Sequence, residues 1–308
     1  MTLQQLEYVM AVYRHKHFAK AAEYCKVTQP TLSSMIQKLE DELGVKIFDR
    51  RRQPIQPTPI GQIIIERAWN VLVRVKRLKE VVEEEKHSFA GTFHLAVLPT
   101  IAPYLIPRFL PALMNDYPNM DIRVTELKTD DMRRAIVRGE VDAGILANID
   151  GLGDFEKRHL YYEKFYVYVA KNDELFNREA IRTFDLKGEY LWLLDEGHCF
   201  RDQLVKFCSL KSAIHSKRTY NLGSIETFMR IVESGKGVTF IPELALPQLT
   251  DKQTELVRPF AYPIPSREII MLTGKNFIRN RLLNFLVTSI QDALPKEMIK
   301  LGKEQKGV

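Results

Sequence analysis

Residues 18–44 read FAKAAEYCKVTQPTLSSMIQKLEDELG, and this stretch constrains the fold more than any other part of the 308-residue chain. Its spacing predicts a helix over 18–25, a short turn KVT, and a second helix that Thr28 caps and that stops at Gly44. The outer face of the second helix offers short hydroxyl and amide side chains with few acids. This arrangement is typical of a helix-turn-helix whose second helix enters the DNA major groove. A plain helical hairpin with a solvated polar face is the alternative.

The segment after Gly44 predicts a wing and a dimerisation helix. VKIFDRRRQPIQPT reads as two extended pieces around a basic turn, whose arginines can hold phosphates or reach into the minor groove. Thr58 then caps a long helix with Pro59 at its first position. The apolar positions of this helix are Ile64, Ala68, Val71, Val75, Leu78 and Val82. Their spacings of four and three form a heptad seam that predicts dimerisation, and packing on its own domain is the alternative.

The basic surplus of the chain lies in this N-terminal segment. Residues 1–79 hold 14 Lys and Arg against 7 Asp and Glu, whereas the whole chain has a net charge of only +6. This distribution favours a nucleic-acid partner for the segment. The start of the chain lacks the apolar run of a signal peptide, and no stretch approaches the roughly 18 apolar residues of a membrane span. We therefore expect a cytoplasmic protein with no membrane partner.

The remainder of the chain predicts a two-lobed α/β domain. From Gly91 onward apolar strands alternate with helices, which indicates a parallel α/β sheet. The segments 165–170, 190–194 and 237–242 predict strands of a second lobe, and 266–273 predicts a strand that returns to the first. Two such lobes enclose a cleft, the default position for a ligand. The polar tail KEMIKLGKEQKGV is expected to fray.

Two threonines stand where predicted strands give way to helices. Thr100 lies in LPTIAPYL, and Thr129 lies in ELKTDDM. Hydroxyls and free amides at helix N-termini make a polar pocket suited to small anions or hydrogen-bonding ligands. Ordinary helix capping is the alternative for each threonine.

Two of the three cysteines lie nine residues apart in GHCFRDQLVKFC. Cys199 is predicted near a helix N-terminus beside His198 and Arg201, where the helix dipole and cationic neighbours favour the thiolate. A thiolate that meets peroxide becomes sulfenic acid, which a second cysteine can convert to a disulfide, so Cys208 is the candidate resolving thiol. Nine helical residues rise about 13.5 Å and turn about 900°, whereas a disulfide needs Cα atoms about 4.4–6.8 Å apart. Pairing would therefore require the helix to unwind.

Two other interpretations of these cysteines stay open. Free cysteines are usually small buried side chains, and Cys208, after an apolar residue, fits that role. A zinc site could use Cys199, Cys208, His198 and His215. Its spacing lacks the usual close pairs of zinc ligands, and opposite helix faces cannot share one ion, so we expect no metal and no other cofactor. Cys25, in the Ala-rich helix, is most simply a packing residue.

The stretch FAKAAEYCKVTQPTLSSMIQKLEDELGVKIFDR, followed by Thr58 and Gly61, resembles the N-terminal signature of LysR-type transcriptional regulators. The resemblance implies a mainly α-helical winged helix-turn-helix over residues 1–58 and a dimerising linker helix over 59–90. It also implies a C-terminal regulatory domain over 91–308, a two-lobed α/β domain of the type-2 periplasmic-binding-protein kind.

The resemblance also implies the division of the regulatory domain and the DNA contacts. Lobe I would comprise residues 91–161 and 266–301, and lobe II residues 162–265. The residues that match the recognition helix and the wing are Gln29, Pro30, Thr31, Ser33, Ser34, Arg50 and Arg51. The implied partners are double-stranded promoter DNA, further copies of the chain and RNA polymerase.

Two further stretches, LLDEGHCFRDQLVKFC and LPTIAPYLIPRFLPAL, resemble the peroxide-sensing activators of this family. This implies that Cys199 is the peroxidatic cysteine, that Cys208 is the resolving one, and that a thiol reductant resets the pair. The implied peroxide pocket comprises Thr100, Thr129, His198, Arg201, Asp202 and Arg267. We expect a redox-responsive transcription factor, a dimer of dimers, that senses hydrogen peroxide and mainly activates oxidative-stress defence genes.

Three other functions fit parts of the pattern. A LysR-type regulator controlled by a small metabolite in the cleft would leave the cysteines incidental. A thiol peroxidase would use the same cysteines catalytically but has no evident use for residues 1–85, so we expect the chain not to be an enzyme. A solute receptor of the same fold would need an export signal, and the DNA-binding head argues against it.

Overall fold

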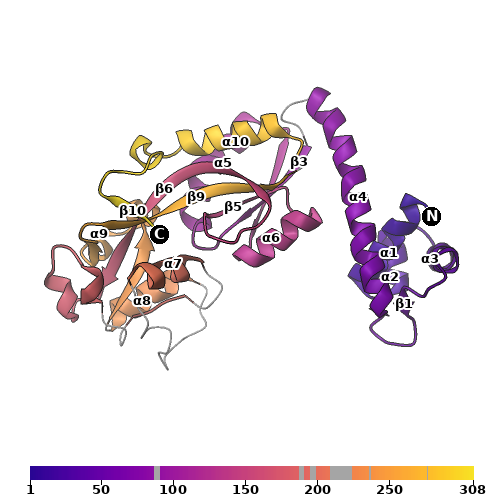
Figure 1. Cartoon of the computed structure of the whole chain (residues 1–308), viewed down its shortest axis with the longest axis horizontal. Coiled ribbons are helices and arrows are strands. Elements are labelled where there is room, and N and C mark those ends of the chain that lie inside the picture. The colour runs from indigo at the N-terminus through magenta and orange to yellow at the C-terminus, as the bar shows by residue number, and fades with distance from the viewer. Residues whose placement is uncertain (87–90, 187–190, 195–198, 209–223, 236, 276) are drawn as a thin grey trace. The chain divides into compact units, whose positions relative to one another are not determined.

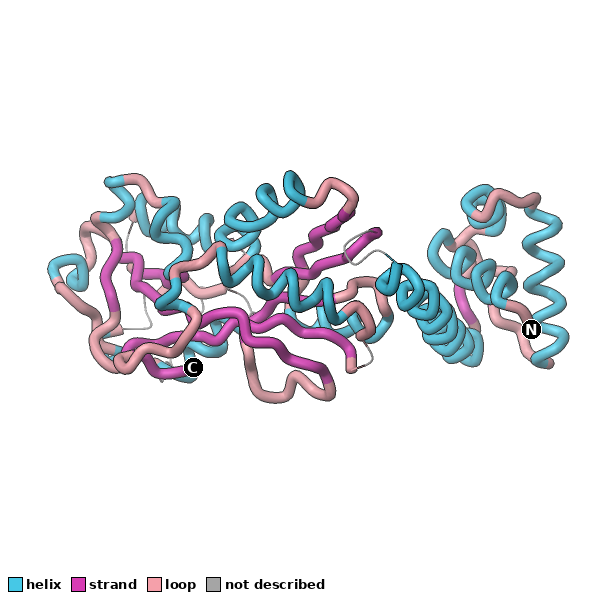
Figure 2. Tube along the Cα trace, turned by 90° about the horizontal axis from the view of Figure 1, so that it is seen from above, coloured by secondary structure: helices cyan, strands magenta, loops and turns pink. Residues whose placement is uncertain are grey.

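The computed structural model describes residues 1–86, 91–186, 191–194, 199–208, 224–235, 237–275 and 277–308. The chain forms two compact units, Met1–Lys86 and His87–Val308. The first is mainly helical, and the second is built around a sheet (Figure 1, Figure 2). Within the described ranges, each helix is too short or too polar to cross a membrane.

The N-terminal unit is a helix-turn-helix followed by a wing and a long helix, as predicted. Its elements are α1 (Leu3–His15), α2 (Phe18–Tyr24), α3 (Gln29–Leu43), β1 (Phe48–Asp49), β2 (Gln56–Pro57) and α4 (Pro59–Lys86). The Thr28 hydroxyl caps α3 by accepting a hydrogen bond from the N–H of Thr31 at 3.4 Å, and Gly44 ends α3 in the left-handed conformation. Apolar side chains of α1, α2 and α3 form one core, against which Cys25 packs as predicted.

A tight junction connects the wing to α4. Thr58 Oγ1 accepts a hydrogen bond from the N–H of Gly61 at 2.9 Å and donates one to the carbonyl oxygen of Lys46 at 2.6 Å. The predicted cap is therefore confirmed. A Cβ atom at Gly61 would lie 1.9 Å from the carbonyl oxygen of Ile47, so this position excludes every larger residue.

The apolar seam along α4 divides into two parts. Ala68 is buried, and Ile64 packs against the core of the same unit. Val71 and Leu78, further along, are 41% and 68% exposed. The alternative of packing on its own domain thus holds for the first part, and dimerisation stays a prediction for the second. The side chain of Val82 lies outside what the structure describes.

The C-terminal unit begins with the predicted alternation of strands and helices. Its first elements are β3 (Gly91–Val97), α5 (Ala102–Asp116), β4 (Met120–Glu126), α6 (Thr129–Arg138) and β5 (Ala143–Ala147). β3 pairs in parallel with β4 and with β5. β9 (Ile264–Gly274) pairs antiparallel with β5 and with β6 (Phe155–Val169). The sheet is therefore mixed, whereas the strand–helix alternation had predicted a parallel one.

The long strand β6 runs through both parts of this unit. Its first residues pair with β9, and residues 165–169 pair antiparallel with β7 (Val238–Pro242). β8 (Val257–Pro259) pairs with β6 in the same region, and the strand order is β4-β3-β5-β9-β6-β7. The remaining elements used below are α7 (Cys199–Phe207), α8 (Ile225–Ser234), η5 (Glu243–Gln248), α10 (Asn280–Asp292) and β10 (Gln305–Gly307). The result is the predicted two-lobed α/β architecture, in which the lobe boundaries stay predictions.

Two predictions of local structure were wrong. Residues 191–194 form no regular strand, because only Leu191 makes an isolated bridge to Val238. The tail does not fray, because β10 pairs in parallel with the beginning of β9 and the N–H of Val308 bonds to the carbonyl of Ser266 at 3.0 Å. Strand pairing uses backbone groups, so the polar side chains of the tail do not prevent it.

Candidate functional site

The outer face of α3 presents most of the predicted recognition residues to solvent. The exposed ones are Gln29, Pro30, Thr31 and Ser34. Ser33 is half-buried, and its hydroxyl accepts a hydrogen bond from Nη1 of Arg50 at 3.3 Å. The exposed hydroxyl and amide groups are suited to base edges, whereas Ser33 belongs to the contact between α3 and the wing.

Arg50 connects the wing to α3. Its Nη2 atom lies 3.2 Å from Oε2 of Glu40, and its guanidinium carbon lies 5.1 Å from the centre of the Phe18 ring. Glu40 is buried, and its Oε1 also accepts the backbone N–H groups of Ile47 at 2.8 Å and of Phe48 at 3.3 Å. Glu40 was not predicted as a site residue, because within the acidic stretch EDE it resembles part of a solvated face.

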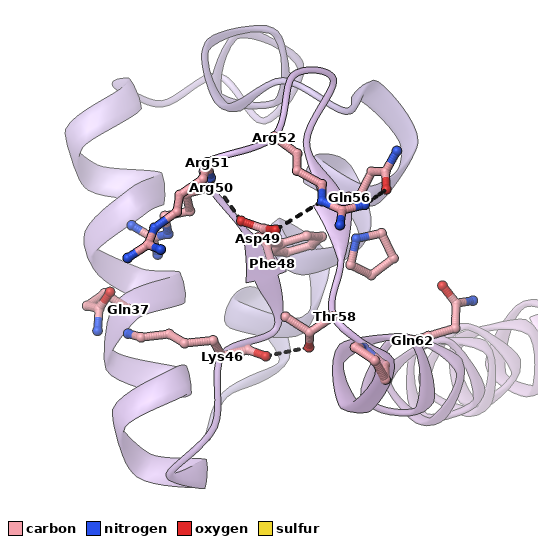
Figure 3. Close-up of a pocket in the computed structure, with 12 residues that line it drawn as sticks. Gln37, Lys46, Phe48, Asp49, Arg50, Arg51, Arg52, Gln56, Thr58 and Gln62 are labelled. Carbon is pink, nitrogen blue, oxygen red and sulfur yellow. Dashed lines mark hydrogen bonds and ion pairs between the residues drawn. The ribbon is translucent and has the colours of Figure 1, made fainter.

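A hollow of about 750 Å³ lies between α3, the wing and the start of α4 (Figure 3). The charged side chains that line it are Lys46, Asp49, Arg50, Arg51 and Arg52. Arg52 is bonded to Asp49 at 3.2 Å and to Gln56 at 3.3 Å, whereas Arg51 is exposed. Because cations outnumber the one carboxylate, the hollow suits the phosphates of nucleic acid.

The predicted helix between the two cysteines is α7. Cys199 is its first residue, and Cys208 follows its last, with its N–H bonded to the carbonyl of Leu204 at 2.9 Å. The helix thus separates the two cysteines by about 13.5 Å along its axis. Cys208 is 7% exposed, and burial raises the pKa of its thiol to about 12, so this thiol is protonated at neutral pH. The side chain of Cys199 lies outside what the structure describes.

Buried contacts hold one face of α7 in place. The ring of Phe200 packs against the ring of Phe165 with centroids 5.0 Å apart, and it lies 4.9 Å from the guanidinium carbon of Arg267. Gln203 Nε2 donates a hydrogen bond to the backbone oxygen of Val308 at 3.0 Å, just beyond β10. Unwinding α7 would therefore disrupt an aromatic contact, a cation–π contact and a link to the tail.

Arg267 forms the centre of a buried polar cluster. It stands opposite Glu163 in the register of β9 and β6, and Oε2 of Glu163 lies 2.8 Å from its Nε and 2.7 Å from its Nη2. Nη1 donates to Thr100 Oγ1 at 3.2 Å, and Nη2 donates to the Thr100 carbonyl oxygen at 3.1 Å. The structure thus brings together two predicted pocket residues, Thr100 and Arg267, and adds Glu163, which the sequence analysis missed.

The two predicted threonines follow adjacent parallel strands. Thr100 lies beyond the end of β3, and Thr129 begins α6 just beyond the end of β4. The N-cap positions of α5 and α6 belong to other residues and make no side-chain cap bond, so the capping alternative is wrong for both threonines. Thr129 Oγ1 is buried with no hydrogen-bond partner among the described residues. Because burying such a hydroxyl unpaired is costly, it is suited to receive a polar ligand.

The other predicted pocket residues are only partly described. Asp202 is described and is exposed on α7, and its place in the pocket stays a prediction. The side chain of Arg201, and all of His198 and His215, lie outside the described residues. The ranges that the structure describes contain no group of three or more His, Cys, Asp or Glu that could hold a metal ion. The zinc alternative depends on the two undescribed histidines, so it stays untested.

Two protein-family models match the chain. "Bacterial regulatory helix-turn-helix protein, lysR family" matches residues 3–62, and "LysR substrate binding domain" matches residues 86–295. The second match alone spans more than half of the chain.

Curated relatives and solved structures agree with these matches. The chain is 32% identical to the "Hydrogen peroxide-inducible genes activator" of Dickeya chrysanthemi over 99% of both proteins. It is 34% identical to the "DNA-binding transcriptional dual regulator OxyR" of Escherichia coli K12, over 87% of this chain and 88% of that one. A full-length OxyR variant from Pseudomonas aeruginosa has a TM-score of 0.76 at 34% identity, covering 94% of this chain and 95% of that chain. OxyR from Porphyromonas gingivalis has a TM-score of 0.66 at 43% identity, covering 70% of this chain and 99% of that chain.

Proposed function

The chain belongs to the LysR family of bacterial transcriptional regulators, and we propose that it senses hydrogen peroxide through a reversible disulfide between Cys199 and Cys208. The observation that carries this proposal is the position of the two cysteines at opposite ends of α7, one at its N-terminus and the other buried. Relatives named hydrogen peroxide-inducible genes activator and OxyR support it. The output is mainly activation of oxidative-stress defence genes.

The first chemical step is the reaction of Cys199 with peroxide. The thiolate sulfur attacks one peroxide oxygen, an S–O bond forms as the O–O bond breaks, and the departing hydroxide takes up a proton to become water. A position in the first turn of a helix favours the thiolate. The proposed pocket for peroxide comprises Thr100, Thr129, His198, Arg201, Asp202 and Arg267. Of these, the buried hydroxyl and guanidinium groups can bind peroxide and stabilise the departing oxygen.

The second step forms the disulfide. The sulfur of Cys208 attacks the sulfenic sulfur of Cys199, and the hydroxyl leaves as water with the thiol proton, so that two thiols have given two electrons to one peroxide. Because the two Cα atoms must approach to about 4.4–6.8 Å, α7 unwinds and Cys208 leaves its buried position. The disulfide thereby stabilises a second conformation of the regulatory unit. A thiol reductant cleaves the disulfide and so restores the first conformation.

The N-terminal unit carries the output of this switch. The exposed side chains of α3 read the major groove of promoter DNA, and Arg51 in the wing contacts phosphate. The exposed apolar residues Val71 and Leu78 of α4 pair with a second copy of the chain, and two such dimers form a tetramer. Oxidation changes the spacing of the DNA-binding heads and the contact with RNA polymerase.

The protein works in the cytoplasm without a cofactor. Each molecule of peroxide oxidises one pair of cysteines, so oxidation is a stoichiometric event rather than a catalytic turnover.

Cysteine mapping tests the proposal directly. The reduced protein is treated with equimolar hydrogen peroxide, quenched with a thiol-blocking reagent, and analysed by peptide mass spectrometry. We expect rapid formation of a Cys199–Cys208 disulfide, with Cys25 unmodified and no disulfide in Cys199→Ser. Sustained peroxide consumption in the presence of a reductant would instead indicate a thiol peroxidase.

A second candidate signal is a small anion bound in the cleft near Thr100, at the ends of the adjacent strands β3 and β4. The buried hydroxyl of Thr129, which has no partner among the described residues, favours this candidate. Two thiols left unmodified by peroxide would refute the disulfide switch and make such an effector the leading explanation. Calorimetry with small carboxylates and inorganic anions would then identify its chemistry.

A further inference from the structure

Glu163 is a buried carboxylate whose only cationic contact among the described residues is Arg267, and the pocket described above assigns it no role. The register of β6 and β9 places the two residues opposite each other. We propose that Glu163 is a positioning residue, which holds the Arg267 guanidinium in the orientation that the reaction of Cys199 with peroxide requires. This inference rests on the proposed function.

Both oxygen atoms of Glu163 have partners. Oε2 accepts a hydrogen bond from Nε of Arg267 at 2.8 Å and lies 2.7 Å from its Nη2, while Oε1 accepts the backbone N–H of Leu244 in η5 at 3.3 Å. A carboxylate accepts hydrogen bonds at both oxygens, whereas a glutamine amide accepts at one end and donates at the other. A glutamine that served Arg267 would therefore direct its NH₂ group at the Leu244 N–H. The position requires a carboxylate, which a merely space-filling role would not.

The hydrogen bonds of Arg267 determine which of its N–H donors is left for a ligand. A guanidinium has five N–H donors. Three of them make hydrogen bonds: Nε donates to Glu163, and Nη1 and Nη2 each donate to Thr100. Nη2 also lies in an ion pair with Glu163 at 2.7 Å, and a second N–H on Nη1 has no hydrogen-bond partner among the described residues. The three bonds fix the guanidinium plane and therefore the direction of this N–H. It is thus available to a peroxide oxygen that lies beside the Thr100 hydroxyl.

Arg267 also lies close to the start of the redox helix. Its guanidinium carbon is 4.9 Å from the ring of Phe200, the residue that directly follows Cys199 in α7, and 5.7 Å from the ring of Phe165. Aromatic rings attract the cation but do not fix its rotation in its own plane. The directional contacts come from Glu163 and Thr100, so these two residues determine how Arg267 faces the first turn of α7.

The charges of the pair depend on each other. Burial raises the pKa of Glu163, and the adjacent guanidinium and the Leu244 N–H oppose that rise. The other titratable groups that interact electrostatically with this pair are Tyr104, Tyr161 and Glu243. Without the carboxylate, the positive charge of Arg267 would no longer be offset near α7. Removing Glu163 should therefore disturb the orientation of Arg267 and increase the net positive potential at the same time.

The test measures the peroxide step alone. The full chain carries Cys208→Ser, so oxidation stops at Cys199, and the second-order rate constant with hydrogen peroxide is measured across a range of pH by quenching and peptide mass spectrometry. Glu163→Gln is compared with this parent and with Glu268→Gln. Glu268 is a matched control because it is the neighbour of Arg267 on β9 but bonds to His159 at 2.8 Å and to Asn148 at 2.7 Å rather than to Arg267.

We expect Glu163→Gln to lower the plateau rate constant by about tenfold to a hundredfold, as misplacement of a catalytic group does. We also expect the acid limb of its pH–rate profile to move to lower pH, because an unopposed cation favours the thiolate. Glu268→Gln should change neither. An unchanged plateau in a folded Glu163→Gln protein would overturn the inference. A parent protein that does not react with peroxide would instead overturn the proposed function, and the inference with it.

A second variant keeps the inference testable if Glu163→Gln does not fold. Glu163→Asp retains two acceptor oxygens, but its side chain is shorter by one methylene group, so the carboxylate lies further from Arg267. We expect a folded protein with a plateau lowered by about tenfold. A rate constant equal to that of the parent would show that the position of the carboxylate is irrelevant, and it would overturn the inference equally.

Discussion

Each unit of the molecule contains a buried glutamate bonded to an arginine, and the two pairs differ in their access to water. In the N-terminal unit, Glu40 is buried but the side chain of Arg50 is 36% exposed. In the C-terminal unit, the side chains of Glu163 and Arg267 are 2% and 0% exposed. Solvent screens the first pair, so its loss is tolerable. In the second pair, removing one partner leaves the other charge buried and uncompensated. The same two residue types therefore contribute little to stability at the surface, whereas in the interior neither can be removed alone without a large loss of stability.

The largest expected effect comes from breaking the interior pair. In Arg267→Ala, Glu163 stays buried without a counter-charge, so the free energy of unfolding should fall by about 3–5 kcal/mol. Urea unfolding of the full chain, followed by circular dichroism, measures this change. Replacing both residues, as Arg267→Met with Glu163→Leu, should recover most of the loss because no charge remains buried. If Arg267→Ala were as stable as the double variant, the buried charge of Glu163 would not be the cause of the loss, and the contrast between the two pairs would be wrong.

A smaller effect is expected at the surface pair, with Arg51 as its control. Arg50→Ala should lower the free energy of unfolding by about 1 kcal/mol, because Glu40 keeps its bonds to two backbone N–H groups. Arg51→Ala should leave stability unchanged but reduce the slope of log affinity against log salt by about one, because a phosphate contact is lost. Fluorescence anisotropy with a DNA duplex at several salt concentrations measures the slopes. Arg50→Ala should weaken binding with little change in slope, and equal slope changes would show that both arginines contact phosphate.

The smallest effect concerns a buried group that is neutral. Burial raises the pKa of Cys208 to about 12, so the folded state keeps the thiol proton at pH values where the unfolded state has lost it. The corresponding stability is complete below the ordinary thiol pKa of about 8.5 and is lost as the pH rises toward about 12. Relative to Cys208→Ala, the parent should lose less than about 1 kcal/mol by pH 9. Denaturant unfolding at several pH values tests this, and parallel pH profiles for both proteins would refute it.

Contacts within one helical turn were predictable from the sequence. Thr28 and Thr58 cap their helices, and Gly44 ends α3, because each depends on backbone groups a few residues away. The position of Cys199 at the start of α7 was predictable for the same reason. The helix-turn-helix, the wing and the two-lobed α/β fold followed from such local patterns together with the family resemblance.

Contacts set by strand register were not predictable. Glu163 and Arg267 are 104 residues apart and meet only because β6 and β9 align them. The pairing of β10 with β9 uses backbone groups and leaves no pattern in the side chains. Arg267 was assigned to the pocket only through the family resemblance, and nothing in the spacing of the chain pointed to its carboxylate partner. Tertiary register therefore decided the part of the candidate site that the sequence analysis missed.

The tight contacts of Thr58 and Gly61 fix the start of α4 to the wing, so α4 and the wing should rotate together as one rigid unit. The 28 residues of α4 give it a length of about 42 Å. If α4 tilts by about 10° about its first turn, its C-terminal end moves by about 7 Å. A displacement of several ångströms applied to the far end of α4 would accordingly reach the wing as a rotation of only a few degrees.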